Sequence, residues 1–89
     1  MAHMYILLTR KPDYYVGSTD DLESRLTKHA TGKVKSTKSK LPVQLVYSEY
    51  YPTRGEAQKR EYQIKRWKSK KLIESLIRKT NIHPHGLIV

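Results

Sequence analysis

Residues 14–29 read YYVGSTDDLESRLTKH, and in this stretch a strand pattern passes directly into a helix pattern. Residues 14–18 are mostly aromatic and aliphatic, which is typical of a half-buried strand. Residues 19–21 supply helix N-cap candidates and place acidic charge where a helix begins. Leucines then recur at helical spacing, which predicts a helix over residues 20–30 that ends at Gly32.

A hairpin is predicted on the N-terminal side of this stretch. Residues 5–9 are a second aromatic and aliphatic segment, and residues 10–13 between the two segments contain the turn formers proline and aspartate. A third strand is predicted over residues 44–51, closed by Pro52. The lysine-studded residues 33–41 that precede it read as a polar loop.

Two further helices are predicted in the C-terminal half. Thr53 and Glu56 have the spacing of a capping box, and the helix that they open runs to about Trp67. Ser69 can cap a last helix with an apolar stripe at helical spacing. The order strand–strand–helix–strand–helix–helix predicts an α/β fold of the α+β type, a small three-stranded and mostly antiparallel sheet flanked by helices.

The length of 89 residues allows one domain with one small core. We expect this domain to span residues 4–79, with residues 1–3 as a vector-derived leader and residues 80–89 as a C-terminal tail. A hydrophobic content of 37% is too high for a disordered chain, and no apolar run approaches the ~18–20 residues that a transmembrane helix needs. The absence of both cysteine and an apolar signal sequence favours the cytoplasm.

The charge of the chain indicates a polyanionic partner. Eighteen lysines and arginines against eight acidic residues give a formal net charge of +10. On so small a domain this favours nucleic acid. A merely basic protein and a binder of anionic membranes remain as alternatives.

Glu61 stands out on the helix that Thr53 opens. It falls at helical spacing between Ala57 and Ile64, on the face that we expect to point inward. A buried carboxylate is costly unless it meets a cation, a metal ion or a hydrogen-bond donor. Placement alone leaves two alternatives open, an ion pair with a lysine or arginine and a metal site.

Arg25 and His29 lie four residues apart on one flank of the first predicted helix. They are either a solvated edge or a phosphate-binding guanidinium beside a titratable imidazole. In the second strand, Tyr14 and Tyr15 must point to opposite faces of the sheet, so at most one of them can share a face with any site.

Several segments together resemble a known pattern. Met4-Tyr5-Ile6 and Tyr15-Val16-Gly17 match two triplets, the helix through Arg25 and His29 follows them, and Ala57 to Glu61 continues the match. In this order and spacing the residues resemble the GIY-YIG nuclease domain in its stand-alone bacterial form, from Tyr5 to about Ile77. The chain departs from that family where Met4 replaces the first glycine. A second departure is Ser18, which stands where the DNA-repair excision nucleases carry a lysine.

The resemblance implies single-metal hydrolysis of phosphodiester bonds. Glu61 would hold one divalent cation, Mg²⁺ or Mn²⁺, and Tyr5 would accept the proton of the attacking water while Tyr15 orients water or metal. His29 is the expected proton partner, because Ser18 carries no charge. Since an unperturbed tyrosine is a poor base at neutral pH, we expect Arg25, His29 and the metal to lower its pKa. Arg25 would also stabilise the charge that builds on the phosphate.

The expected function is a metal-dependent DNA endonuclease of little sequence specificity that acts in DNA repair or processing, with DNA preferred to RNA. A non-catalytic nucleic-acid-binding module and, more weakly, a basic adaptor for protein partners are the alternatives. The surface that we expect to contact phosphate lies on the lysine-studded loop and at the junction of the last two helices. It comprises Lys33, Lys35, Thr37, Lys38, Lys40, Lys65 and Lys68.

Overall fold

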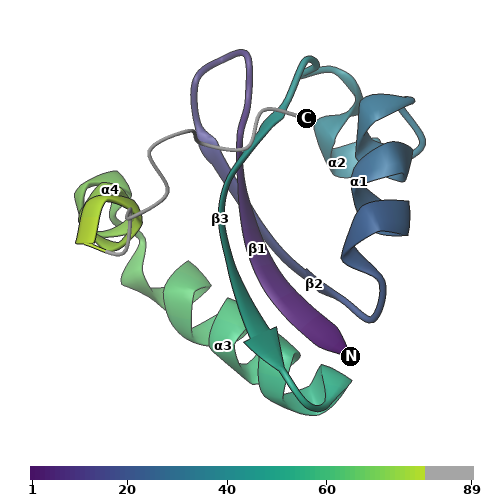
Figure 1. Ribbon diagram of the computed structural model, residues 1–89. Helices are drawn as coiled ribbons and strands as arrows, with labels where there is room; N and C mark the ends of the chain where they lie inside the picture. Colours follow the sequence, from purple (N-terminus) through teal and green to yellow (C-terminus); the bar gives the residue numbers. More distant parts are fainter. Residues whose placement is uncertain (80–89) are drawn as a thin grey trace.

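The computed structural model describes residues 1–79, and its centre is a three-stranded antiparallel sheet. The strands are β1 (Ala2–Leu8), β2 (Tyr14–Thr19) and β3 (Gln44–Tyr51), in the order β2-β1-β3. β2 is therefore an edge strand, and Tyr5 of β1 pairs with Gly17 on it. The α+β architecture is confirmed (Figure 1).

The first hairpin extends further toward the N-terminus than the sequence predicts. β1 begins at Ala2, which is 1% exposed, and His3 pairs with Thr19 of β2 and Tyr50 of β3. At the other end of the hairpin, the Thr9 backbone N–H donates to the Asp13 carbonyl at 2.9 Å and closes the turn. Residues 2 and 3 thus belong to the sheet.

In the described residues four helices cover the sheet, α1 (Leu22–Ala30), α2 (Lys35–Lys38), α3 (Arg54–Trp67) and α4 (Lys70–Lys79). The Asp21 side chain caps α1, and the Thr53 side chain caps α3 by accepting from the Glu56 N–H, as its capping-box spacing predicts. The segment predicted as a loop contains the four-residue α2, which is a correction to the sequence analysis.

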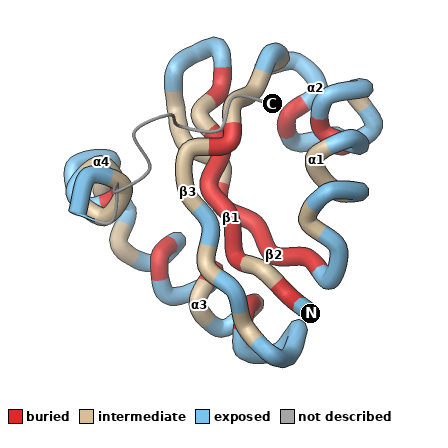
Figure 2. The backbone as a smooth tube through the Cα atoms, in the orientation of Figure 1, coloured by how far each residue is buried: buried red, intermediate tan, exposed pale blue. Residues whose placement is uncertain are grey.

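Two apolar clusters lie on opposite faces of the sheet, because alternate residues of a strand point to opposite sides. On one face, Met4 and Ile6 pack with Ile64 of α3 and Ile73 of α4. On the other face, Tyr5 and Leu7 pack with the leucines of α1. Figure 1 shows the same division, with α3 and α4 on one side of the sheet and α1 and α2 on the other. Buried residues concentrate along β1 and β2 (Figure 2).

A polar network ties β3 to α3. The Glu49 carboxylate accepts hydrogen bonds from the hydroxyls of Tyr47 and Tyr51 and from the Arg60 guanidinium at 3.0 and 3.2 Å. Burial opposes ionisation of Glu49, but these donors outweigh it and hold the carboxyl pKa below its ordinary value. This carboxylate is fully engaged within the fold.

In residues 1–79 no helix is long and apolar enough to cross a membrane. The predicted tail over residues 80–89 lies outside the described residues.

Candidate active site

The hydroxyl of Tyr5 is the centre of a buried polar cluster. Tyr5 lies in the central strand β1 and is 0% exposed. Its oxygen lies 2.9 Å from His29 Nε2, and the Arg25 Nε–H donates to it at 3.4 Å. The fold therefore brings Tyr5, Arg25 and His29 together, as the sequence predicts, because the flank of α1 that carries the last two faces the sheet.

His29 is held from both of its ring nitrogens. It is 0% exposed, and its Nδ1 lies 2.8 Å from the hydroxyl of Thr37 on α2. Burial, with the positive charge of Arg25 as a second cause, lowers the pKa of His29 to about 4. The imidazole is therefore neutral at pH 7, with one nitrogen a donor and the other an acceptor.

Two expectations are corrected by this geometry. Thr37 is 0% exposed and hydrogen-bonded to His29, so its hydroxyl does not belong to the predicted phosphate-contacting surface. The neutral His29 supplies no positive charge to Tyr5. The pKa of Tyr5 is raised by burial, which outweighs the lowering by the Arg25 hydrogen bond.

Gly17 explains how Tyr5 reaches the edge of the sheet. A Cβ added at Gly17 would lie 2.6 Å from both Cζ and the hydroxyl oxygen of Tyr5, so the tyrosine ring lies directly across this glycine. Because β2 is an edge strand, the Tyr5 hydroxyl above Gly17 lies at the β2 edge of the sheet, which is called the rim below. A glycine inside a strand commonly marks such a close approach.

Glu61 of α3 lies at the same β2 edge of the sheet, but on the opposite face. Its side chain is 12% exposed, and its Oε1 accepts from the Ser18 hydroxyl at 2.6 Å. Ser18 is the neighbour of Gly17 in β2 and points to the opposite face. The negative charge of Glu61 is felt at Tyr5, where it contributes to the raised pKa.

The second oxygen of Glu61 is also occupied. Lys65, one turn along α3, donates to Oε2 at 2.6 Å. The ion pair that the sequence left open as an alternative is therefore present. In residues 1–79 no group of three or more histidine and acidic side chains is placed to hold a metal ion.

A single carboxylate still fits the cation that the sequence resemblance implies. Mg²⁺ commonly uses one or two carboxylates and fills its other positions with water and substrate phosphate. Glu61 is nearly buried, ionisable and held in place through Ser18, which is the chemistry that such a site needs.

Tyr15 completes the face that carries Tyr5. Its ring centroid lies 5.1 Å from that of His29 and 6.3 Å from that of Tyr5. The pKa of Arg25 is raised, first by its hydrogen bond with Tyr5 and further by the nearby Tyr15. Tyr14 points to the opposite face, where its hydroxyl donates to Glu74 at 3.4 Å, so of the two tyrosines Tyr15 is the one that shares a face with Tyr5 and His29.

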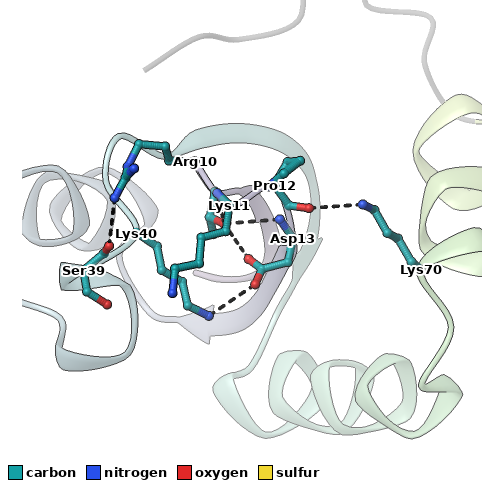
Figure 3. Close-up of polar contacts among 8 residues, drawn as sticks. Arg10, Lys11, Pro12, Asp13, Ser39, Lys40 and Lys70 are labelled. Atoms are coloured by element: carbon teal, nitrogen blue, oxygen red, sulfur yellow. Dashed lines mark hydrogen bonds and ion pairs between the residues drawn. The ribbon is translucent and has the colours of Figure 1, made fainter.

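The predicted basic surface divides into exposed and engaged side chains. Lys33, Lys35 and Lys38 lie on residues 33–40, called the α2 segment because they contain α2, and all three are exposed. Lys68 is exposed as well. Lys40 is partly buried and pairs with Asp13 at 3.4 Å. Figure 3 shows Lys40 reaching Asp13, Arg10 reaching Ser39 and Lys70 reaching Pro12, so the β1–β2 turn joins the α2 segment to α4.

Four residues make contacts at the site that the sequence did not predict: Gly17, Ser18, Thr37 and Lys65. The spacing of Glu61 and Lys65 at i and i+4 on a helix is a local signal that predicts their contact. The contacts of Ser18 with Glu61 and of Thr37 with His29 join distant segments, and nothing local predicts them.

Comparison with known proteins gives a consistent result. A family model described as the GIY-YIG catalytic domain matches residues 1–74. A UPF0213 protein of Staphylococcus saprophyticus is 41% identical over 73 residues, which cover 81% of this chain and 89% of that protein. A UPF0213 protein of Bacillus pumilus is 38% identical over 88 residues, covering 93% and 90%. The solution NMR structure of a UPF0213 protein from Bacillus halodurans is similar with a TM-score of 0.61 at 33% identity, covering 97% of this chain and 92% of that one.

Proposed function

The chain belongs to the GIY-YIG catalytic domain family, and from this premise we propose that it is a metal-dependent endonuclease that hydrolyses phosphodiester bonds in DNA. Membership implies a nuclease-type domain that binds nucleic acid, and nucleases of this family generally depend on a divalent metal. The finer assignments below are proposals that rest on the site geometry.

The proton of the attacking water passes to Tyr5. The Tyr5 hydroxyl donates its own proton to His29 Nε2 as its oxygen accepts the proton from water, so the phenol need not ionise beforehand. This path suits the raised pKa of Tyr5 and the neutral state of His29. In this scheme Nδ1–H donates to the Thr37 oxygen, 2.8 Å away, which selects the tautomer in which Nε2 is the acceptor.

Arg25 has two tasks in this scheme. Its Nε–H donates to the Tyr5 oxygen and orients the lone pair that meets the water. Its other guanidinium donors are positioned to stabilise negative charge on the phosphate, since Arg25 lies partly exposed at the rim. Tyr15, packed against His29, orients the water.

Glu61 is the residue that would hold the divalent cation, Mg²⁺ or Mn²⁺. When bound, the cation supplies positive charge that neutralises the scissile phosphate and the leaving oxygen. Ser18 keeps the carboxylate in place by donating to Oε1. Action on DNA in preference to RNA, little sequence specificity, a role in DNA repair or processing and a cytoplasmic location remain predictions.

One observation carries the proposal: the Tyr5 hydroxyl lies between a neutral imidazole and a guanidinium, at the rim where a nearly buried carboxylate arrives from the opposite layer. A small core has no structural need for this combination, because buried polar groups oppose folding unless each is paired.

The proposal is tested by comparing Tyr5→Phe with Tyr14→Phe. Both changes remove one tyrosine hydroxyl from neighbouring strands, but only that of Tyr5 contacts His29 and Arg25. Since general acid–base catalysis contributes about 10²–10⁴-fold, we expect Tyr5→Phe to lose at least about 10²-fold in Mg²⁺-dependent plasmid cleavage and Tyr14→Phe to stay near the parent.

Circular dichroism and thermal unfolding of both variants check that they remain folded. Equal and mild losses would make the tyrosines packing residues. Tight binding of nicked, flapped, branched and duplex DNA with no cleavage by the parent protein would instead identify a non-catalytic nucleic-acid-binding module.

A further inference from the structure

Lys65 differs from the exposed lysines predicted to contact phosphate, because it is ion-paired with a buried carboxylate. Its Nζ lies 2.6 Å from Glu61 Oε2, whereas Lys33, Lys35 and Lys38 extend from the surface. The Lys65 side chain is 49% exposed and the Glu61 side chain only 12%. The carboxylate is therefore fixed in the fold, and the ammonium is at the end of a half-exposed, flexible chain that can leave it.

A divalent cation and Lys65 compete for the same oxygen. The neutral Ser18 hydroxyl already donates to Oε1, so Oε2 is the oxygen left for a positively charged partner, and the Lys65 ammonium occupies it. Leaving a buried carboxylate unpaired is strongly unfavourable, and a cation that arrives must replace the ammonium rather than find the carboxylate free.

A groove beside Lys65 has room for the ammonium group when it is not bound to Glu61. Lys65 lines a groove of about 330 Å³ together with Lys68 and Lys70, and Tyr15 of the site lines the same groove. Asp13 is the acidic residue in this lining, and it is already paired with Lys40. A released Lys65 would join two other lysines beside the site, where it attracts a phosphate of the bound nucleic acid.

We propose that Lys65 is a two-position residue that couples metal binding to nucleic-acid binding. Without metal it neutralises Glu61; when a divalent cation takes the carboxylate, Lys65 turns into the groove and contacts phosphate. The inference rests on the proposed function in that Glu61 must be the metal-binding residue. Because coupling between two ligands is reciprocal, nucleic acid also tightens metal binding through the same side chain.

Metal affinity of the free protein is the first test. Mn²⁺ binding, followed by the EPR signal of the free ion, is compared in the parent, Lys65→Met and Lys68→Met. Lys68→Met is the matched control, since it removes the same charge close by, from a lysine that is exposed and has no ion pair in residues 1–79. We expect Lys65→Met to bind Mn²⁺ at least about fivefold more tightly and Lys68→Met to stay within about twofold of the parent.

Nucleic-acid affinity is the second test, measured by fluorescence anisotropy of a short labelled DNA duplex in EDTA and in Ca²⁺, with the integrity of the probe checked. We expect Lys65→Met to weaken binding several-fold in Ca²⁺, where its phosphate contact is lost, and clearly less in EDTA, where Lys65 makes no such contact. Lys68→Met weakens binding equally in both conditions, because its side chain faces solvent in both. Glu61→Gln, which frees Lys65 without metal, raises the affinity in EDTA, and adding Lys65→Met removes this gain.

The outcomes separate this inference from the function on which it rests. If Glu61→Gln leaves Mn²⁺ binding unchanged, the metal site itself is wrong and the coupling falls with it. If Glu61→Gln weakens Mn²⁺ binding but Lys65→Met and Lys68→Met behave alike, Glu61 remains the metal-binding residue and only the coupling by Lys65 is overturned.

Discussion

At the scale of single residues, the site depends on the absence of a side chain at Gly17. The ring of Tyr5 occupies the space that a Cβ would fill. The Tyr5 hydroxyl can therefore lie over the edge strand β2, at the rim of the sheet. The glycine has no positive φ to explain it, since among the described glycines only Gly32 has one. Its role is to permit the close approach of Tyr5.

Gly17→Ala should therefore impair cleavage more than folding. The new methyl group would lie 2.6 Å from the Tyr5 ring, so the tyrosine must move. A displacement of about 1 Å in a positioned group can cost about 10²-fold in rate, and we expect a loss of that order in a plasmid-cleavage assay. Gly55→Ala is the matched control, because a Cβ at Gly55 meets nothing within 4 Å. Parental activity in Gly17→Ala would contradict the placement of Tyr5.

His29 makes the stability of the fold depend on pH. Burial lowers its pKa from 6.5 to about 4, so between these values the unfolded chain binds more protons than the folded one. The contribution is fully present above pH 6.5 and is lost as the pH falls toward 4, at a slope of at most about 1.4 kcal/mol per pH unit.

Urea unfolding at several pH values between 7.5 and 4.5 measures this dependence. The parent should lose stability through the window, and His29→Gln should show a flatter profile because it removes the group that titrates. Parallel profiles for the two proteins would show that the imidazole is not held neutral by the fold.

At the scale of elements, the sequence predicts the long periodic segments well and the short irregular one poorly. The strands and α1, α3 and α4 are marked by alternation, leucine spacing and capping residues that act locally. α2 has no such pattern, because its four residues are two lysines, a serine and a threonine. It is held by tertiary contacts instead, the burial of Val34 and the hydrogen bond of Thr37 to His29.

The α2 segment still presents the exposed lysines that we expect to contact DNA. Neutralising Lys35 and Lys38 together to glutamine should weaken binding to all sequences alike. The slope of log affinity against log salt should decrease by about 1.8, since each phosphate contact on duplex DNA contributes about 0.9.

The control for the α2 double variant removes two positive charges from α3 and α4. Lys59 on α3 and Lys79 at the end of α4 are both exposed, and their double replacement by glutamine should leave the slope close to that of the parent. An unchanged slope in the α2 double variant would place the DNA path on another surface.

At the scale of the whole molecule, the site is assembled from the two layers that sandwich the sheet. Arg25 and His29 come from α1 on one side, and Glu61 comes from α3 on the other. The pairing of Tyr5 with Gly17 sets how they meet at the β2 edge. The residues could be singled out one by one, from a carboxylate on an inward helix face and a polar pair on a helix flank, while their expected roles came from the resemblance to the family. Their meeting could not be predicted, because it depends on strand register and strand order.

If Glu61 makes this domain a metal-dependent nuclease, plasmid cleavage in Mg²⁺ must distinguish Glu61→Ala from Glu56→Ala. Both substitutions remove a carboxylate from α3, but Glu56 is exposed and hydrogen-bonds to Thr53, the cap of its helix. Metal charge stabilisation is worth several kcal/mol, so Glu61→Ala should lose at least about 10³-fold while keeping its fold and most of its DNA affinity. Glu56→Ala should cleave as the parent does. Cleavage by Glu61→Ala at the parental rate in saturating Mg²⁺ would show that Glu61 does not hold the catalytic metal ion.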